Sequence, residues 1–183
     1  MLTAPIFISV FWAIFLVYWI VSAFNTKRYA RRGLMSWGVR LLILLVISAI
    51  DSLPGIHSFF LGVQYSLVVQ WIGVVLCGAG VSFAIWARMH LGRNWGMPMS
   101  LKEEAELVTS GPYAYVRHPI YTGFILAGLG SSLVTVWWVP PFIVLSAYFV
   151  YAGKREEMSM QNEFPNRYPE YMKRTKMLIP FVF

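Results

Sequence analysis

Long apolar runs separated by short polar segments are the feature that most limits what this chain can fold into. About 20 apolar residues in a helix cross the roughly 30 Å hydrocarbon layer of a bilayer. Since backbone groups in hydrocarbon must be satisfied within the segment, such runs fold as helices. We therefore expect an all-α integral membrane protein. About five transmembrane helices are expected, at approximately Pro5–Phe24, Trp37–Leu53, Tyr65–Ala87, Pro119–Trp137 and Val139–Gly153.

Local sequence signals predict what the first apolar run and the last two apolar runs form. Pro5–Phe24 has no basic segment before it and no clear cleavage site, so it is expected to be a retained helix and not a signal peptide. Pro140 and Pro141 mark a very short connection between the last two runs. These two runs should therefore form an antiparallel helical hairpin.

Composition and charge indicate the partner. Of 183 residues, 58% are hydrophobic and only 13% are charged, whereas soluble domains average about 25% charged residues. The net charge of +7 could suggest nucleic acid, but the basic residues lie beside the apolar runs. The lipid bilayer with its anionic headgroups is therefore the expected partner, and nucleic acid is not. No metal site is expected, and the oligomeric state stays open.

The charge pattern also predicts the orientation. The segment Asn25–Ser36 carries four basic residues and no acidic one, which is typical of a cytoplasmic loop. With five spans, the N-terminus lies outside and the C-terminus is cytoplasmic. The membrane would be the inner membrane of a bacterium or archaeon, or the endoplasmic reticulum of a eukaryote.

Small residues recur along the third and fourth spans and predict close helix packing. They are Gly73, Cys77, Gly78, Gly80 and Ser82 in the third span, and Gly123, Ala127, Gly128, Gly130 and Ser131 in the fourth.

Polar chemistry is concentrated where the fourth span begins. Pro119 suits the first turn of a helix, which places Arg117 and His118 at the mouth of that helix. A helix N-terminus with an arginine beside it can bind a carboxylate or phosphate. A basic anchor next to the membrane is the alternative. Glu156 and Glu157 follow the fifth span, where an acid either has a functional partner or lies on a solvated face.

These motifs together resemble the isoprenylcysteine carboxyl methyltransferase family, which is related to phospholipid N-methyltransferases. The resemblance covers roughly the C-terminal half of the chain. The matching residues are Gly92-Arg-Asn-Trp95, Leu107-Val108, Ser110-Gly-Pro-Tyr113, Arg117-His-Pro-Ile-Tyr121, Gly123, Glu156-Glu157, Phe164, Tyr168, Tyr171 and Leu178-Ile-Pro180.

The resemblance implies a methyltransferase that uses S-adenosyl-L-methionine in a cytoplasmic pocket and methylates a lipophilic acceptor, isoprenylcysteine-carboxylate-like or another lipid. Residues 1–183 would form one domain, with an N-terminal helix pair in 1–64 and the catalytic core with its tail in 65–183. The acceptor would lie against Arg155 and Glu157, and no catalytic residue is assigned. The cofactor would lie against Ala105, Glu106, Leu107, Val108, Tyr113, Arg117, His118, Pro119, Ile120, Tyr121 and Glu156.

The chain departs from the family pattern at three positions. Ala105 replaces a common histidine, Ala152 replaces an arginine expected one turn before Glu156, and Pro165 replaces a glycine. Three alternatives stay open. They are N-methylation of a phospholipid amine, a sterol-reductase-like enzyme that uses NADPH, and a non-catalytic lipid-binding membrane protein.

Overall fold

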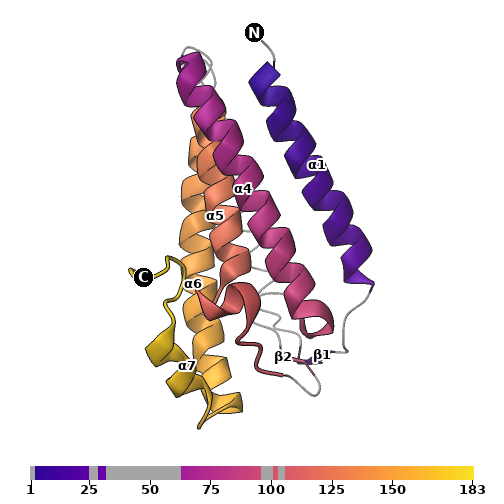
Figure 1. Ribbon diagram of the computed structural model, residues 1–183, viewed down its shortest axis with the longest axis vertical. Helices are drawn as coiled ribbons and strands as arrows, with labels where there is room; N and C mark the ends of the chain where they lie inside the picture. The colour runs from indigo at the N-terminus through magenta and orange to yellow at the C-terminus, as the bar shows by residue number, and fades with distance from the viewer. Residues whose placement is uncertain (1–2, 25–28, 32–62, 96–100, 103–105) are drawn as a thin grey trace.

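The computed structural model describes residues 3–24, 29–31, 63–95, 101–102 and 106–183. Four long helices run along the length of the molecule (Figure 1). They are α1 (Thr3–Ala23), α4 (Leu67–Leu91), α5 (Pro119–Val134) and α6 (Val139–Glu163). The predicted span Trp37–Leu53 lies outside the described residues.

Short elements complete the described part of the chain. Two strands, β1 (Tyr29–Arg31) and β2 (Leu101–Lys102), pair antiparallel, with Tyr29 opposite Lys102. The helix α7 (Tyr168–Arg174) lies beside the lower end of α6 (Figure 1). Single 3-10 turns are η1 (Gly92–Asn94), η2 (Gly111–Ala114) and η3 (Val136–Trp138).

Three of the described helices, α1, α4 and α6, are long and apolar enough to cross a membrane. The fourth predicted span is a shorter apolar helix, because α5 ends at Val134 and η3 follows as a separate turn. The helical and membrane character expected from the sequence is confirmed. α5 and α6 form the expected hairpin, joined through η3.

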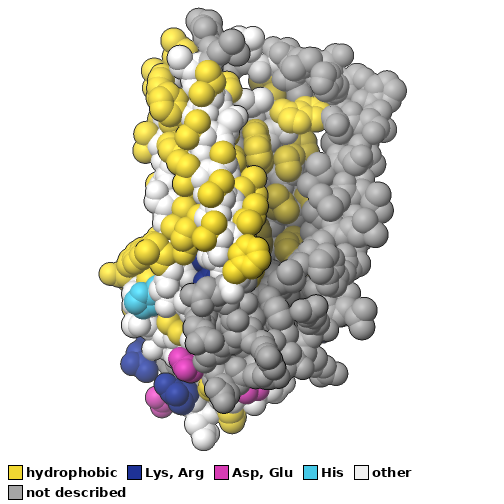
Figure 2. All heavy atoms as spheres, turned by 90° about the vertical axis from the view of Figure 1, so that its right-hand side faces the viewer, with side chains coloured by type: hydrophobic (Ala, Val, Ile, Leu, Met, Phe, Trp, Pro, Cys, Tyr) yellow, Lys and Arg dark blue, Asp and Glu magenta, His cyan; other side chains and the backbone are white. Residues whose placement is uncertain are grey.

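Charge and apolar surface separate along the bundle. On the face shown in Figure 2, hydrophobic side chains cover the upper part, and Lys, Arg, Asp and Glu side chains gather at the lower end. α6 continues to Glu163, beyond the apolar span expected to end at Gly153. Glu156 and Glu157 therefore lie on the helix itself, where its apolar part gives way to polar residues.

Small residues bring α4 and α5 into the closest contact in the described bundle. A side chain on Gly80 would lie 2.4 Å from the backbone nitrogen of Ala127, and one on Gly130 would lie 2.4 Å from that of Cys77. The fully buried Cys77 and Ala127 belong to the core formed by α1, α4 and α5. The predicted packing of small residues is confirmed at these positions, whereas Ser82 is exposed, and the packing holds the N-terminus of α5 next to the end of α4.

Candidate active site

The chain after α7 lies along the segment that precedes α5. The backbone N–H groups of Arg117 and His118 donate to the carbonyl oxygens of Lys176 and Met177 at 2.9 and 3.1 Å. The Thr122 hydroxyl donates to the Leu178 carbonyl oxygen at 2.7 Å. These bonds fix the segment before α5, so that its polar side chains have defined positions.

Arg117 makes an ion pair with an acid on α6. Its Nε donates to Oε1 of Glu157 at 2.5 Å, and its Nη1 donates to the carbonyl oxygen of Thr175. The two charged side chains are only 9% and 11% exposed. In this structure Arg117 thus ties α6 to the tail, although the sequence suggested it as a ligand for an anionic group.

His118 lies between the two acids of α6. Its Nδ1 is 3.4 Å from Oε2 of Glu156, and its Nε2 is 3.5 Å from Oε1 of Glu157. Nε2 is buried and has no hydrogen-bond partner within the described part of the chain. Burial by itself lowers the pKa of His118, but hydrogen bonding and the negative charges of Glu156 and Glu157 outweigh it, so the pKa is raised.

Tyr121 completes this cluster from the first turn of α5. Its hydroxyl donates to Oε1 of Glu156 at 2.7 Å. Its ring stacks on His118, with centroids 5.4 Å apart and planes 4° apart, and on Phe149 at 4.9 Å. We call Arg117, His118, Tyr121, Glu156 and Glu157 the polar cluster. It combines two carboxylates with two basic side chains and a tyrosine, and a carboxylate is the group in it that attracts a cation.

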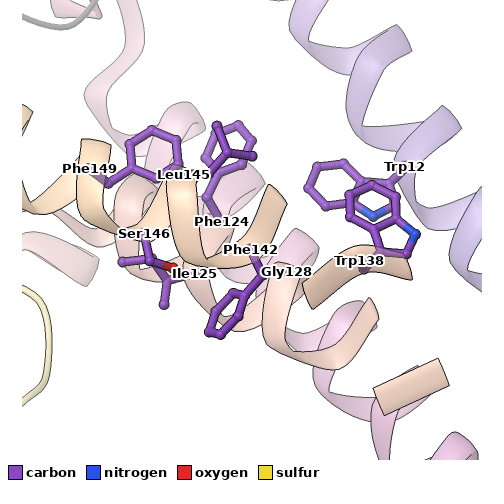
Figure 3. A pocket seen from close by; sticks show the side chains of 9 residues that line it. All are labelled: Trp12, Phe124, Ile125, Gly128, Trp138, Phe142, Leu145, Ser146 and Phe149. Atoms are coloured by element: carbon purple, nitrogen blue, oxygen red, sulfur yellow. The ribbon is translucent and has the colours of Figure 1, made fainter. Parts of the chain in front are cut away.

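An apolar groove begins where the polar cluster ends. Phe149, which stacks on Tyr121, lies at one end of this groove, and Trp12 and Trp138 lie together at the other (Figure 3). The two tryptophan rings are stacked 5.5 Å apart. The hydroxyl of Ser146, which lines the groove, is buried without a hydrogen-bond partner among the described residues. The groove is lined by Trp12, Phe124, Ile125, Gly128, Trp138, Phe142, Leu145, Ser146 and Phe149.

Comparison with known proteins bears on this arrangement. The model of the isoprenylcysteine carboxyl methyltransferase (ICMT) family matches residues 71–162, which include α5, most of α4 and α6, and the whole polar cluster. The chain belongs to this family.

Several curated relatives share this similarity. Protein-S-isoprenylcysteine O-methyltransferase B of Arabidopsis thaliana is 26% identical over 164 residues, which cover 88% of this chain and 78% of the relative. Protein-S-isoprenylcysteine O-methyltransferase of Schizosaccharomyces pombe is 35% identical over 101 residues, which cover 52% of this chain and 43% of the relative. A nickel-cobalt-cadmium resistance protein of Alcaligenes xylosoxydans xylosoxydans is 29% identical over 115 residues, which cover 60% of this chain and 52% of the relative.

The resemblance to the ICMT family also implies that four residues preceding η2 in the chain, 105–108, lie against the cofactor. Ala105 lies outside the described residues. Glu106 is exposed and accepts a hydrogen bond from Nδ2 of Asn94 at 3.2 Å, while Leu107 and Val108 are half-buried. Val108 packs against the same apolar cluster as Tyr121. The structure thus brings Val108 near the polar cluster and leaves Glu106 at the surface.

Tyr113 and the residues around Pro119 form the buried base of the site. Tyr113, Pro119 and Ile120 are buried, and the carbonyl oxygen of Tyr113 accepts a hydrogen bond from the Tyr171 hydroxyl. Burial raises the pKa of the Tyr113 phenol far above its usual range. Its hydroxyl therefore stays protonated at any physiological pH.

The two residues expected to contact the acceptor differ in environment. Arg155 is exposed on α6, whereas Glu157 is buried and paired with Arg117. Ala152 is fully buried within the apolar cluster that contains Tyr121 and Phe149. An arginine at position 152 would not fit this packing. Neighbouring apolar side chains thus enclose the position at which the family pattern has an arginine.

The sequence reasoning did not single out Arg88. This buried residue donates from Nη1 to the Gly92 carbonyl oxygen and from Nη2 to the Ser22 carbonyl oxygen, each at 2.7 Å. Its guanidinium also lies 4.7 Å from the centre of the Trp95 ring. Arg88 therefore joins the polar ends of α1 and α4. A lone charge in the last turn of an otherwise apolar helix is the signal that could have identified it.

Proposed function

We propose that this protein is an S-adenosyl-L-methionine-dependent methyltransferase that acts on a lipophilic acceptor at the cytoplasmic face of a membrane. Membership of the ICMT family supports the methyl-transfer class. The observation that carries the proposal is the contact between Tyr121 and Phe149, because it joins the polar cluster to the apolar groove. A polar group and an apolar chain can thus meet at one point.

The residues present fit the proposed methyl donor. When bound, S-adenosyl-L-methionine supplies a methyl group activated by its sulfonium charge. The carboxylate of Glu156 suits its ammonium group, since a carboxylate and an ammonium form a charge-assisted hydrogen bond. His118 lies against the same carboxylate, with its Nδ1 3.4 Å from Oε2 of Glu156. By family resemblance, the backbone of residues 105–108 would face the adenosine.

The acceptor is proposed to approach from the bilayer. Its apolar chain would lie along the groove between α1, α5 and α6, with its reactive head at Phe149 and Tyr121. The protein's contribution is then to align donor and acceptor and to exclude water, since the donor is already activated. An acceptor carboxylate needs no general base, and none is assigned.

We further propose that the acceptor is an isoprenylcysteine carboxylate. Several relatives carry this substrate in their names, including the Arabidopsis thaliana and Schizosaccharomyces pombe proteins. Residues 65–183 would provide this activity and residues 1–64 would flank it. The charged end of the bundle would face the cytoplasm, with the N-terminus outside, and no metal would be required.

The test combines binding and turnover in detergent-purified protein. Calorimetry should show saturable binding of S-adenosyl-L-methionine, and Glu156→Gln should weaken it by about tenfold or more, because a charge-assisted hydrogen bond contributes about 1.5–3 kcal/mol. Tritium from the methyl donor should enter N-acetyl-S-farnesylcysteine. Unchanged affinity in Glu156→Gln would overturn the site assignment.

The same assay separates the remaining candidates. Label in phosphatidylethanolamine vesicles, with none in the farnesylcysteine compound, would identify a phospholipid amine N-methyltransferase. Binding of NADPH without S-adenosyl-L-methionine would favour a reductase. Lipid binding with neither cofactor would favour a non-catalytic lipid-binding protein.

A further inference from the structure

The last residues of the chain expose a compact apolar surface. In residues 179–183, which we call the tail hook, Phe181 is 90% exposed and Val182 is 72% exposed. Ile179 and Phe183 are 52% and 45% exposed. Adjacent large apolar side chains exposed to this degree are characteristic of a surface that contacts a partner or a membrane.

The tail hook is a folded turn that holds these side chains outward. The Phe183 carbonyl oxygen accepts hydrogen bonds from the backbone N–H groups of Leu178 and Ile179 at 2.7 and 2.5 Å. The N–H groups of Val182 and Phe183 donate to the Ile179 carbonyl oxygen at 3.1 and 3.0 Å. Phe181 has φ of 66°, a conformation uncommon for residues other than glycine. Phe181 thus lies in a hydrogen-bonded turn with its side chain 90% exposed.

The position of the tail hook relative to the bundle points to the bilayer as its partner. Figure 1 shows the C-terminal end of the chain beside α6, above α7 and level with the lower end of α1. That level is where the membrane-length helix α1 ends, at Ala23. The exposed basic side chains of Lys173, Arg174 and Lys176 lie just before it in the chain. Apolar and aromatic tips flanked by basic residues suit the boundary between acyl chains and anionic headgroups.

We propose that the tail hook inserts into the cytoplasmic-side headgroup and acyl boundary of the bilayer in which the helices lie. It is directly continuous with Lys176 and Met177, whose carbonyl oxygens hold the segment before α5, and with Leu178, whose carbonyl oxygen binds Thr122 in α5. Insertion of the tail hook would therefore anchor the segment 176–178, whose backbone carbonyl oxygens hold Arg117 and His118. This inference concerns membrane contact and does not depend on the proposed reaction.

Depth-dependent fluorescence quenching tests the proposal. Phe181→Cys is labelled with an environment-sensitive fluorophore and reconstituted into vesicles of phosphatidylcholine and phosphatidylglycerol. We expect a blue-shifted emission relative to water, and stronger quenching by nitroxides near the headgroup than by nitroxides deep in the acyl chain. Emission as in water, without quenching by either lipid, would overturn the proposal.

Matched controls make the result specific. Glu170→Cys places the label on an exposed position of α7, and this label should stay accessible to water-soluble iodide. Wild-type protein, whose single cysteine is the buried Cys77, provides the labelling blank. Self-quenching of the label at position 181 that rises with the protein-to-lipid ratio, without quenching by the nitroxide lipids, would show contact with a second copy of the protein. That result would also overturn the proposal.

Discussion

The Tyr121 hydroxyl donates a 2.7 Å hydrogen bond to Oε1 of Glu156, which fixes the carboxylate from the first turn of the neighbouring helix. Tyr121→Phe keeps the ring stacking and removes this bond. We expect the affinity for S-adenosyl-L-methionine to fall by about tenfold, the equivalent of about 1.4 kcal/mol, because the carboxylate is no longer held in place. Calorimetry measures the change. Tyr115→Phe, at an exposed position, is the control and should bind like wild type.

Removing one partner of the ion pair between Arg117 and Glu157 should lower the free energy of unfolding more than removing both partners. Arg117→Met leaves the buried Glu157 with only the more distant His118 beside it and should lower the free energy of unfolding by about 3 kcal/mol. The double variant with Glu157→Leu should recover much of this loss, because no uncompensated buried charge remains. Thermal unfolding in detergent checks both. A double variant as unstable as the single one would show that the Arg117 bond to Thr175 dominates.

The position of His118 between two glutamates predicts that the stability of the protein depends on pH. Its folded pKa is raised above the ordinary value of 6.5, so protonation stabilises the folded state through Glu156 and Glu157. This contribution is complete below about pH 6.5 and is lost as the pH rises through the raised folded pKa. The melting temperature should therefore fall over that interval. His118→Gln should flatten the profile, whereas His90→Gln should retain it. A wild-type profile identical to that of His118→Gln would contradict the prediction.

The contact between α4 and α5 should not tolerate a side chain at Gly80. Gly80→Ala would press against the backbone of Ala127 and Gly123, which cannot move without shifting a whole helix. We expect a loss of at least about 1–3 kcal/mol in the free energy of unfolding. Gly78→Ala is the matched variant, since its side chain would meet only the edge of the Phe11 ring at 3.0 Å. Equal stability of the two variants would disprove the close backbone approach.

Much of the helix arrangement follows from the sequence because apolar length and small-residue spacing are local properties. The spans beginning near Pro5, Tyr65 and Pro119 correspond to α1, α4 and α5, and the proline pair correctly predicted the hairpin. Boundaries were less accurate. α6 extends past Gly153 because a helix continues through polar residues once its backbone hydrogen bonds are formed, so loss of hydropathy does not mark its end.

The candidate site was only partly predictable. The resemblance placed Tyr121, His118 and Glu156 together, and the structure shows them in contact. It could not show that Arg117 is already paired with Glu157, because a motif gives residue types and not which charged side chain faces which. The bond from Arg88 to Ser22 joins residues 66 positions apart and is equally invisible in a pattern of residue types.

By itself the sequence determined that this chain forms apolar membrane-length helices, that its charge gathers at one end and that it belongs to a methyltransferase family. These follow from hydropathy, charge and motif, which each segment carries independently of its neighbours. Only the tertiary structure decided which acid faces which base, how Phe149 links the polar cluster to the groove, and where the tail hook points. Those relationships depend on the packing of α5 against α6 and on the tail beside both. Packing is a property of side chains brought together from distant parts of the chain.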